Sequence, residues 1–177
     1  MAKWNIDPDH SVAGFEVRHM KVATVRGQFN SIHGTLDFDL NNPARSSAEA
    51  TIDISGITTG NKTRDDHLRS PDFFDVETYP AMTFRSAAVE ITAPNRLKLT
   101  GDLTIRGIAR PVIMDVEFFG PVKSPFGGET TMGFAATATI NRFDFDVKWN
   151  ELMEDGGLIV GKEVRIMLDL EADMVEE

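Results

Sequence analysis

The chain has 177 residues, of which 41% are hydrophobic and 26% are charged, so we expect one domain with one core over residues 1–177. The net charge of −10 argues against a nucleic-acid partner and against docking on an anionic membrane surface. No cysteine is present, which excludes disulfides, thiolate catalysis and cysteine-ligated metal sites.

Much of the first third of the chain alternates between apolar and polar residues, the pattern of half-buried strands. Trp4–Asp7 reads as a short extended piece that ends in a proline-containing turn. The alternation is clear over Ala13–His19, residues 36–40 and residues 48–54. By this parity His19 shares the inward face of its strand.

A different pattern covers residues 61–80. Asn61 is a suitable N-cap for a short polar helix over residues 63–68. Phe73 and Phe74 follow on a turn, and two adjacent phenylalanine rings need a large apolar surface to cover them. We therefore interpret this insert as a lid against the open end of a β-structure.

Alternating segments then continue to the end of the chain, separated by turn residues and by an irregular stretch over residues 141–161. They cover residues 82–85, 97–105, 112–118, 132–140 and 164–170.

These patterns predict an all-β fold of about eight antiparallel strands with one helical insert. A β-sandwich and a closed barrel both fit strands with one apolar face. Two features favour the barrel: the strands are rather long, and small residues are mixed with Phe and Met on the inward faces. A barrel of eight strands is wide enough for one ligand. The residues predicted to line its tunnel are Phe15, Val17, His19, Phe38, Ile52, Met82, Phe84, Leu97, Leu99, Leu103, Met114, Val116, Phe118, Phe134, Ala136 and Ala138.

The four histidines do not have the spacing of a metal site on one strand or helix, so we predict no metal and no cofactor. His19, buried by parity, is either a hydrogen-bonded core residue or a contact to a ligand head group. Arg64 and His67 belong either to a solvated helix surface or to a head-group site at the lid.

Two further polar groups have simpler interpretations. His10 is close enough to Asp7 in sequence for a local turn bond. Arg142 ends an apolar strand, and we expect an ion pair at the barrel rim with Asp144 or Asp102.

No Gly-x-Ser-x-Gly turn is present and no serine stands in a recognisable triad, so no catalytic residue is predicted. The alternative function is an enzyme that acts on a hydrophobic substrate inside the tunnel, with His19 or His67 as the acid or base.

The chain resembles the YceI-like family over Trp4 to about Leu170. The resemblance rests on motifs that occur in the same order: Asp7-x-x-His10-Ser11, Phe15-x-Val17-x-His19-Met20, Gly27-x-Phe29, His67-Leu68, Phe73-Phe74-Asp75, Tyr79-Pro80-x-Met82-x-Phe84, Gly101-x-Leu103-Thr104-x-x-Gly107 and Asn141-Arg142-x-Asp144-Phe145. It implies a lipocalin-like barrel whose apolar tunnel binds a polyisoprenoid or another long-chain lipid, and it is compatible with a homodimer.

Many members of that family are periplasmic. The N-terminus of this chain lacks the apolar run of a signal peptide, and no later segment is apolar enough for stable membrane insertion. We expect a cytoplasmic protein if the sequence is complete, and a periplasmic one if a leader was removed.

Overall fold

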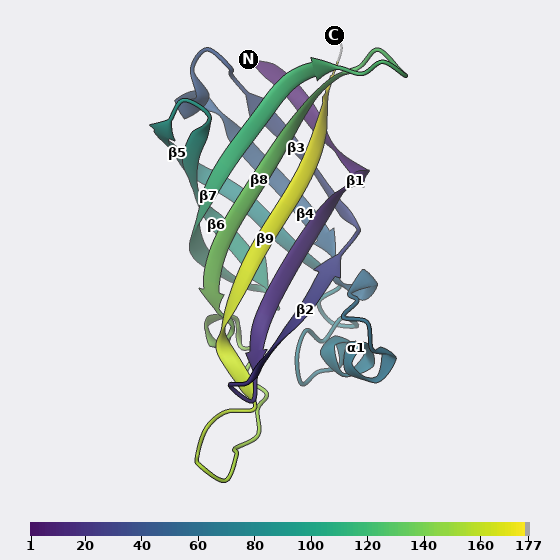
Figure 1. Cartoon of the computed structure of the whole chain (residues 1–177), viewed down its shortest axis with the longest axis vertical. Helices are drawn as coiled ribbons and strands as arrows, with labels where there is room; N and C mark the ends of the chain where they lie inside the picture. Colours follow the sequence, from purple (N-terminus) through teal and green to yellow (C-terminus); the bar gives the residue numbers. More distant parts are fainter. Residues whose placement is uncertain (176–177) are drawn as a thin grey trace.

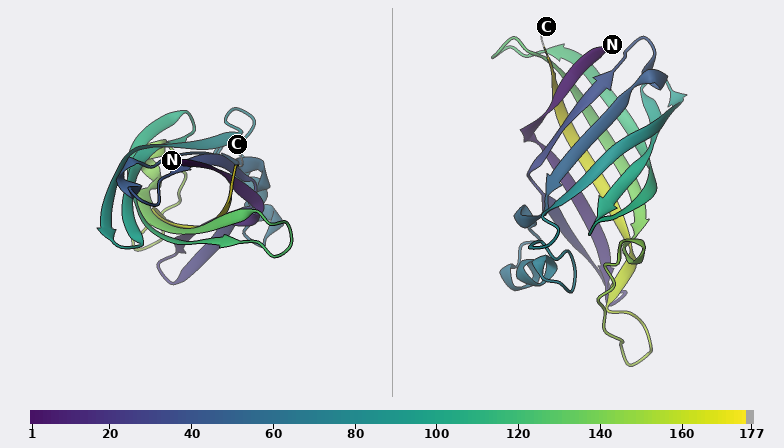
Figure 2. Two further views of the ribbon diagram at one scale, coloured as in Figure 1. Left: turned by 90° about the horizontal axis from the view of Figure 1, so that it is seen from above. Right: turned by 180° about the vertical axis from the view of Figure 1, so that it is seen from behind.

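Strand β1 (Ala2–His19) closes a single antiparallel sheet into a barrel, because it pairs with β3 along one edge and with β9 along the other. The computed structural model describes residues 1–175. The remaining strands are β2 (Ala23–Phe29), β3 (Ile32–Phe38), β4 (Ser47–Asp53), β5 (Ala81–Ala93), β6 (Arg96–Ile105), β7 (Ile108–Lys123), β8 (Thr130–Asn141) and β9 (Val160–Met174). Figure 2 shows the closed ring of strands from above.

Within residues 1–175, nine strands occupy eight positions around the barrel. β2 pairs with the C-terminal half of β1 and β3 pairs with its N-terminal end, both along the same edge. The bend predicted near Phe29 is therefore a break between two strands that share one position. The predicted all-β barrel of about eight antiparallel strands is confirmed.

The predicted turn after Asp7 is wrong. β1 continues through Pro8, and its register against β9 shifts between Asp7 and Val12. A bulge of this kind accommodates a residue without a backbone N–H, since the ladder is already interrupted there.

The inward faces of the strands form one core, as the alternation predicts. Met114 and Val116 on β7 are buried, whereas their neighbour Ile113 points outward and is 60% exposed. Gly101 leaves no empty space, because a side chain there would collide with the ring of Phe84.

Two segments lie at the barrel end opposite the chain termini (Figure 1). The first is the insert, which contains the 3₁₀ turn η2 (Ile54–Gly56) and the helix α1 (Lys62–Arg69). The second follows β8 and begins with η3 (Arg142–Phe145). A third 3₁₀ turn, η1 (Pro43–Arg45), precedes β4. None of the helices found within residues 1–175 has the length and apolar character needed to cross a membrane.

Candidate functional site

The barrel encloses a cavity of about 220 Å³. All its lining residues are apolar or glycine except Arg142. Of the predicted tunnel residues, it is lined by Phe15, Val17, Ile52, Met82, Phe84, Leu99, Leu103, Met114, Val116, Phe134 and Ala136. The interior of the barrel therefore offers an almost wholly apolar surface, with one charged side chain in its wall.

The other predicted tunnel residues lie elsewhere. Phe38 and Leu97 line a second cavity of about 50 Å³. Phe118 and Ala138 are buried in the core but line neither cavity. His19 is half-buried and lines neither of them, so its inward position stays a prediction. The register of β1 against β9 shifts between Val17 and His19, but the pairing of β1 with β2 continues without a shift as far as His19 and Ala23.

Both end segments contribute to the cavity wall, although the tunnel residues predicted from the sequence include none of theirs. Leu68, Phe73 and Phe74 come from the insert, and Phe145 and Val147 come from the segment after β8. The two phenylalanines of the insert carried a signal, since they were expected to press on an apolar surface. No sequence signal marked Phe145 and Val147, because the segment that contains them shows no hydrophobic periodicity.

The insert and the segment after β8 meet through three aromatic rings. The His67 ring lies edge-on to Trp149, with 4.8 Å between centroids, and edge-on to Phe73 at 5.0 Å. Phe73 is 6% exposed and packs against Trp149 at 5.3 Å. Phe73 also lines the cavity, so this contact lies next to the cavity wall, and we call the two segments together the lid. The expected lid role of the insert agrees with this arrangement.

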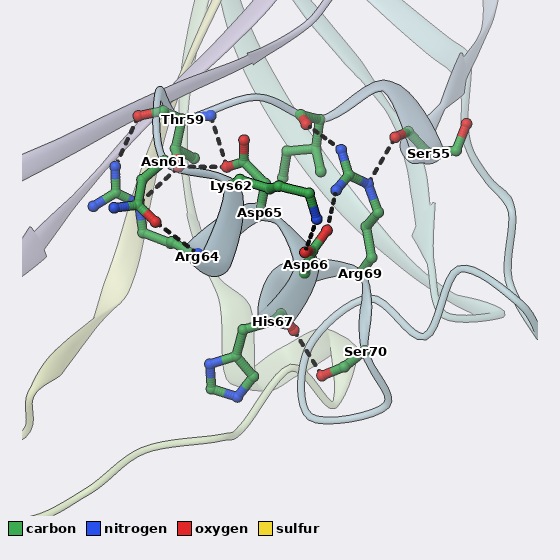
Figure 3. Close-up of polar contacts among 11 residues, drawn as sticks. Ser55, Thr59, Asn61, Lys62, Arg64, Asp65, Asp66, His67, Arg69 and Ser70 are labelled. Atoms are coloured by element: carbon green, nitrogen blue, oxygen red, sulfur yellow. Dashed lines mark hydrogen bonds and ion pairs between the residues drawn. The ribbon is translucent and has the colours of Figure 1, made fainter.

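Polar side chains shape the insert (Figure 3). Asn61 caps α1 by accepting from the backbone N–H of Arg64. Asp65 is 7% exposed and accepts from the backbone N–H and the hydroxyl of Thr59, at 2.8 and 2.5 Å. Arg69 donates to the carbonyls of Ser55 and Ile57, at 2.8 and 2.9 Å. The helix is thereby fastened to the chain that leads into it.

Arg106, in the turn between β6 and β7, fastens the lid to the barrel. Its guanidinium donates to the carbonyls of Pro71 and Phe73. The same group lies 3.9 Å from the carboxylate of Asp146 in the other lid segment. One side chain therefore holds both halves of the lid.

Arg142 is 5% exposed and does not form the ion pair predicted from the sequence. Its guanidinium donates to four backbone carbonyls instead, those of Val147, Trp149, Val160 and Gly161, at 2.8 to 3.0 Å. Asp144 is exposed on η3, away from this group. Burial lowers the pKa of Arg142 to about 10, so it stays charged at neutral pH. Its role is to fold the second lid segment.

The three head-group candidates do not line the cavity. Arg64 is exposed and donates to Thr59, at 2.7 Å from Nε to the hydroxyl. The Nε2 atom of His67 lies 2.8 Å from a carboxylate oxygen of Asp72. Arg64 and His67 are nevertheless on the lid, whereas His19 is at the end of β1. Contact of any of them with a head group stays a prediction.

The local bond expected between Asp7 and His10 is present, with 2.6 Å between Oδ2 and Nδ1. This bond raises the pKa of His10 and lowers that of Asp7. Glu171, the cross-strand partner of Asp7, lies 3.8 Å from the same imidazole nitrogen. The three side chains lie within the reach of one ion, with donor atoms at most 4.8 Å apart, but the hydrogen bond of the imidazole to Asp7, beside the carboxylate of Glu171, accounts for the arrangement.

Comparisons with known proteins agree with the fold. The sequence profile of a family described as a YceI-like domain matches residues 4–172. A UPF0312 protein of Staphylococcus epidermidis is 39% identical over 165 residues, which cover 93% of this chain and 94% of that protein. The crystal structure of BcnA from Burkholderia cenocepacia superposes with a TM-score of 0.82 at 30% identity, covering 94% of this chain and 98% of BcnA.

A polyisoprenoid-binding domain from Saccharophagus degradans has the same fold. It superposes with a TM-score of 0.70 and covers 99% of this chain and 100% of that domain. Its sequence is only 14% identical, so the likeness concerns the fold alone.

Proposed function

This chain belongs to the YceI-like family, and from that premise we propose that it binds a long-chain apolar lipid inside the barrel. The ligand class is a polyisoprenoid or a similar isoprenoid or fatty-acid derivative. Enclosure of the chain would serve carriage, storage or sequestration, since the hydrocarbon is removed from water.

The observation that carries this proposal is the apolar wall of the 220 Å³ cavity. An empty apolar space loses dispersion contacts, so a hydrocarbon that fills it stabilises the folded state. An engineered apolar cavity of about 150 Å³ already binds benzene. The polyisoprenoid-binding domain that shares the fold supports the same class of ligand.

The lid is the proposed entrance. Arg142 is the one polar residue in the cavity wall, as far as the described residues go, and its donors already bind backbone carbonyls. A polar head group would therefore find no partner inside the cavity, and we place it outside. The opposite end is occupied by the buried rings of Phe38, Phe118 and Phe134. Arg64 and His67, on the lid, are the proposed contacts of the head group.

We propose binding without catalysis. An acid or base must come within hydrogen-bond reach of the substrate atom that it serves. His19 and His67 do not line the cavity, and the Nε2 atom of His67 is engaged by Asp72. This arrangement favours a carrier over the enzyme considered as the alternative.

Native mass spectrometry of the delipidated protein with added farnesol and geranylgeraniol tests the proposal. We expect one-to-one complexes and a melting temperature that rises with ligand concentration. If neither alcohol produces a complex or a thermal shift, the proposal is wrong.

A further inference from the structure

Three phenylalanine rings form a cluster beside the two cavities of the barrel. Phe38 lies edge-on to Phe118, with 5.1 Å between centroids, and edge-on to Phe134, at 5.4 Å. Phe134 lines both cavities, and it is the aromatic residue among those that do, the others being Leu36, Ala48, Leu99 and Val116. Phe38 lines only the smaller cavity. The Phe134 ring therefore stands in the wall between them.

The smaller cavity lies where β4 and β5 part. Their pairing ends at Glu49 and Arg85. One residue further along β4, the backbone N–H of Ala48 donates to the hydroxyl of Ser86, at 2.8 Å. The cavity is lined there by Ser47 at the start of β4 and by Val89 on β5. It thus continues the barrel interior toward a place where these two strands are no longer paired.

We propose that Phe134 sets the length of hydrocarbon chain that the barrel accepts, with the smaller cavity as the binding site for the far end of a long chain. The inference rests on the proposed lipid-binding function. A chain that fills the main cavity stops at the Phe134 ring. A longer chain turns the ring aside and extends between β4 and β5.

The energies involved permit the Phe134 ring to be displaced by a long chain. Turning Phe134 aside loses one edge-to-face contact, with Phe38, while the chain that enters gains the burial of its own methylene groups. Burial of a few methylene groups outweighs one aromatic pair. The ring therefore discriminates between chains that differ by about one isoprene unit rather than excluding long chains altogether.

The test is a series of linear prenols of two to nine isoprene units, titrated against the parent protein, Phe134→Leu and Phe118→Leu. The two variants remove the same ring from the same cluster, but Phe118 lines neither cavity. For the parent protein, affinity should rise with length and then level off. Phe134→Leu should move this limit upward by at least one unit and strengthen binding of the first longer prenol roughly tenfold. Phe118→Leu should leave the limit unchanged.

A second change checks the route of the chain. Val89→Phe, combined with Phe134→Leu, fills the smaller cavity and should cancel the gain for long prenols while short ones bind as before. Equal length limits for Phe134→Leu and Phe118→Leu would overturn this inference and leave the proposed function standing. Failure of every prenol to bind the parent protein would overturn both.

Discussion

The indole of Trp149 packs on the ring of Phe73, with 5.3 Å between centroids, and so joins two segments that are far apart in the sequence. Trp149 follows η3, and Phe73 belongs to the insert. Their contact is where a hydrocarbon chain would have to pass if the lid is the entrance. The strength of this contact then controls the exchange of ligand.

Trp149→Ala should accelerate release of a bound prenol. An aromatic contact of this kind contributes about 1 kcal/mol, which corresponds to roughly a fivefold faster dissociation. Stopped-flow displacement of prebound geranylgeraniol measures the rate. Trp149→Phe keeps an aromatic ring and serves as the control. Equal dissociation rates for the alanine variant and the parent protein would show that the chain leaves by another path.

Phe73→Ala should destabilise the protein by roughly 3–5 kcal/mol, because the ring is fully buried. Phe74 is only half-buried, so Phe74→Ala should cost less. Urea unfolding of both variants gives the comparison. A loss below about 0.5 kcal/mol for Phe73→Ala, the size expected of a surface change, would mean that the insert is not docked.

The sequence predicted those strands in which apolar and polar residues alternate strictly. Strands such as β6 and β7 show their inward faces directly, since every second residue is apolar. The sequence also predicted that residues 61–80 form a lid. That prediction relied on a helix N-cap and on two adjacent phenylalanines whose rings require an apolar surface to pack against.

The rest depended on contacts between distant segments. The sequence around Arg142 does not indicate that its guanidinium would donate to backbone carbonyls between Val147 and Gly161. Those carbonyls approach Arg142 only after the chain has folded back to begin β9. The absence of His19 from the cavity wall was missed because alternation along a strand indicates the face of a residue but not where along the barrel the cavity ends.

Arg142→Lys should destabilise the second lid segment. An ammonium group has three donors on a single nitrogen and cannot serve four carbonyls spread around a planar guanidinium. Leaving buried carbonyls unpaired should cost at least about 2 kcal/mol. Urea unfolding gives this loss, and hydrogen exchange of residues 147–160 shows where it acts. The control is Arg165→Lys on the exposed face of β9. Similar stabilities for the two variants would contradict the role assigned to Arg142.

The pair of Asp7 and His10 should make stability depend on pH. The pKa of His10 is raised above its ordinary value of 6.5, mainly by the hydrogen bond to Asp7 and also by the charges of Glu171 and Asp9. Its contribution is therefore complete below pH 6.5 and is lost as the pH rises through the higher value of the folded state. The pKa of Asp7 is lowered from 3.8, mainly by the bond to His10, so its contribution is lost as the pH falls through the lower value of the folded state.

The melting temperatures of the parent protein and of His10→Gln should therefore differ most near pH 5, and the difference should shrink at higher pH. The effect should be small, since both groups are near the surface. Asp7→Asn should show the same profile, because the bond needs both partners. A difference that does not vary with pH would show that the pair does not contribute to stability as a charged pair.

The central claim is that an apolar chain occupies the barrel, and Ala136→Trp tests it most directly. Ala136 is 6% exposed and lines the main cavity, so a tryptophan there fills the space that the ligand needs. Thr137, the next residue, is exposed on the outer face of β8, and Thr137→Trp is the matched control. In a site without free space the inward tryptophan would cost roughly 1–3 kcal/mol by overpacking. The measurement is prenol occupancy by native mass spectrometry, with the melting temperature of each variant. We predict full occupancy for Thr137→Trp and none for a folded Ala136→Trp, whereas unchanged occupancy in a well-folded Ala136→Trp protein would contradict the account.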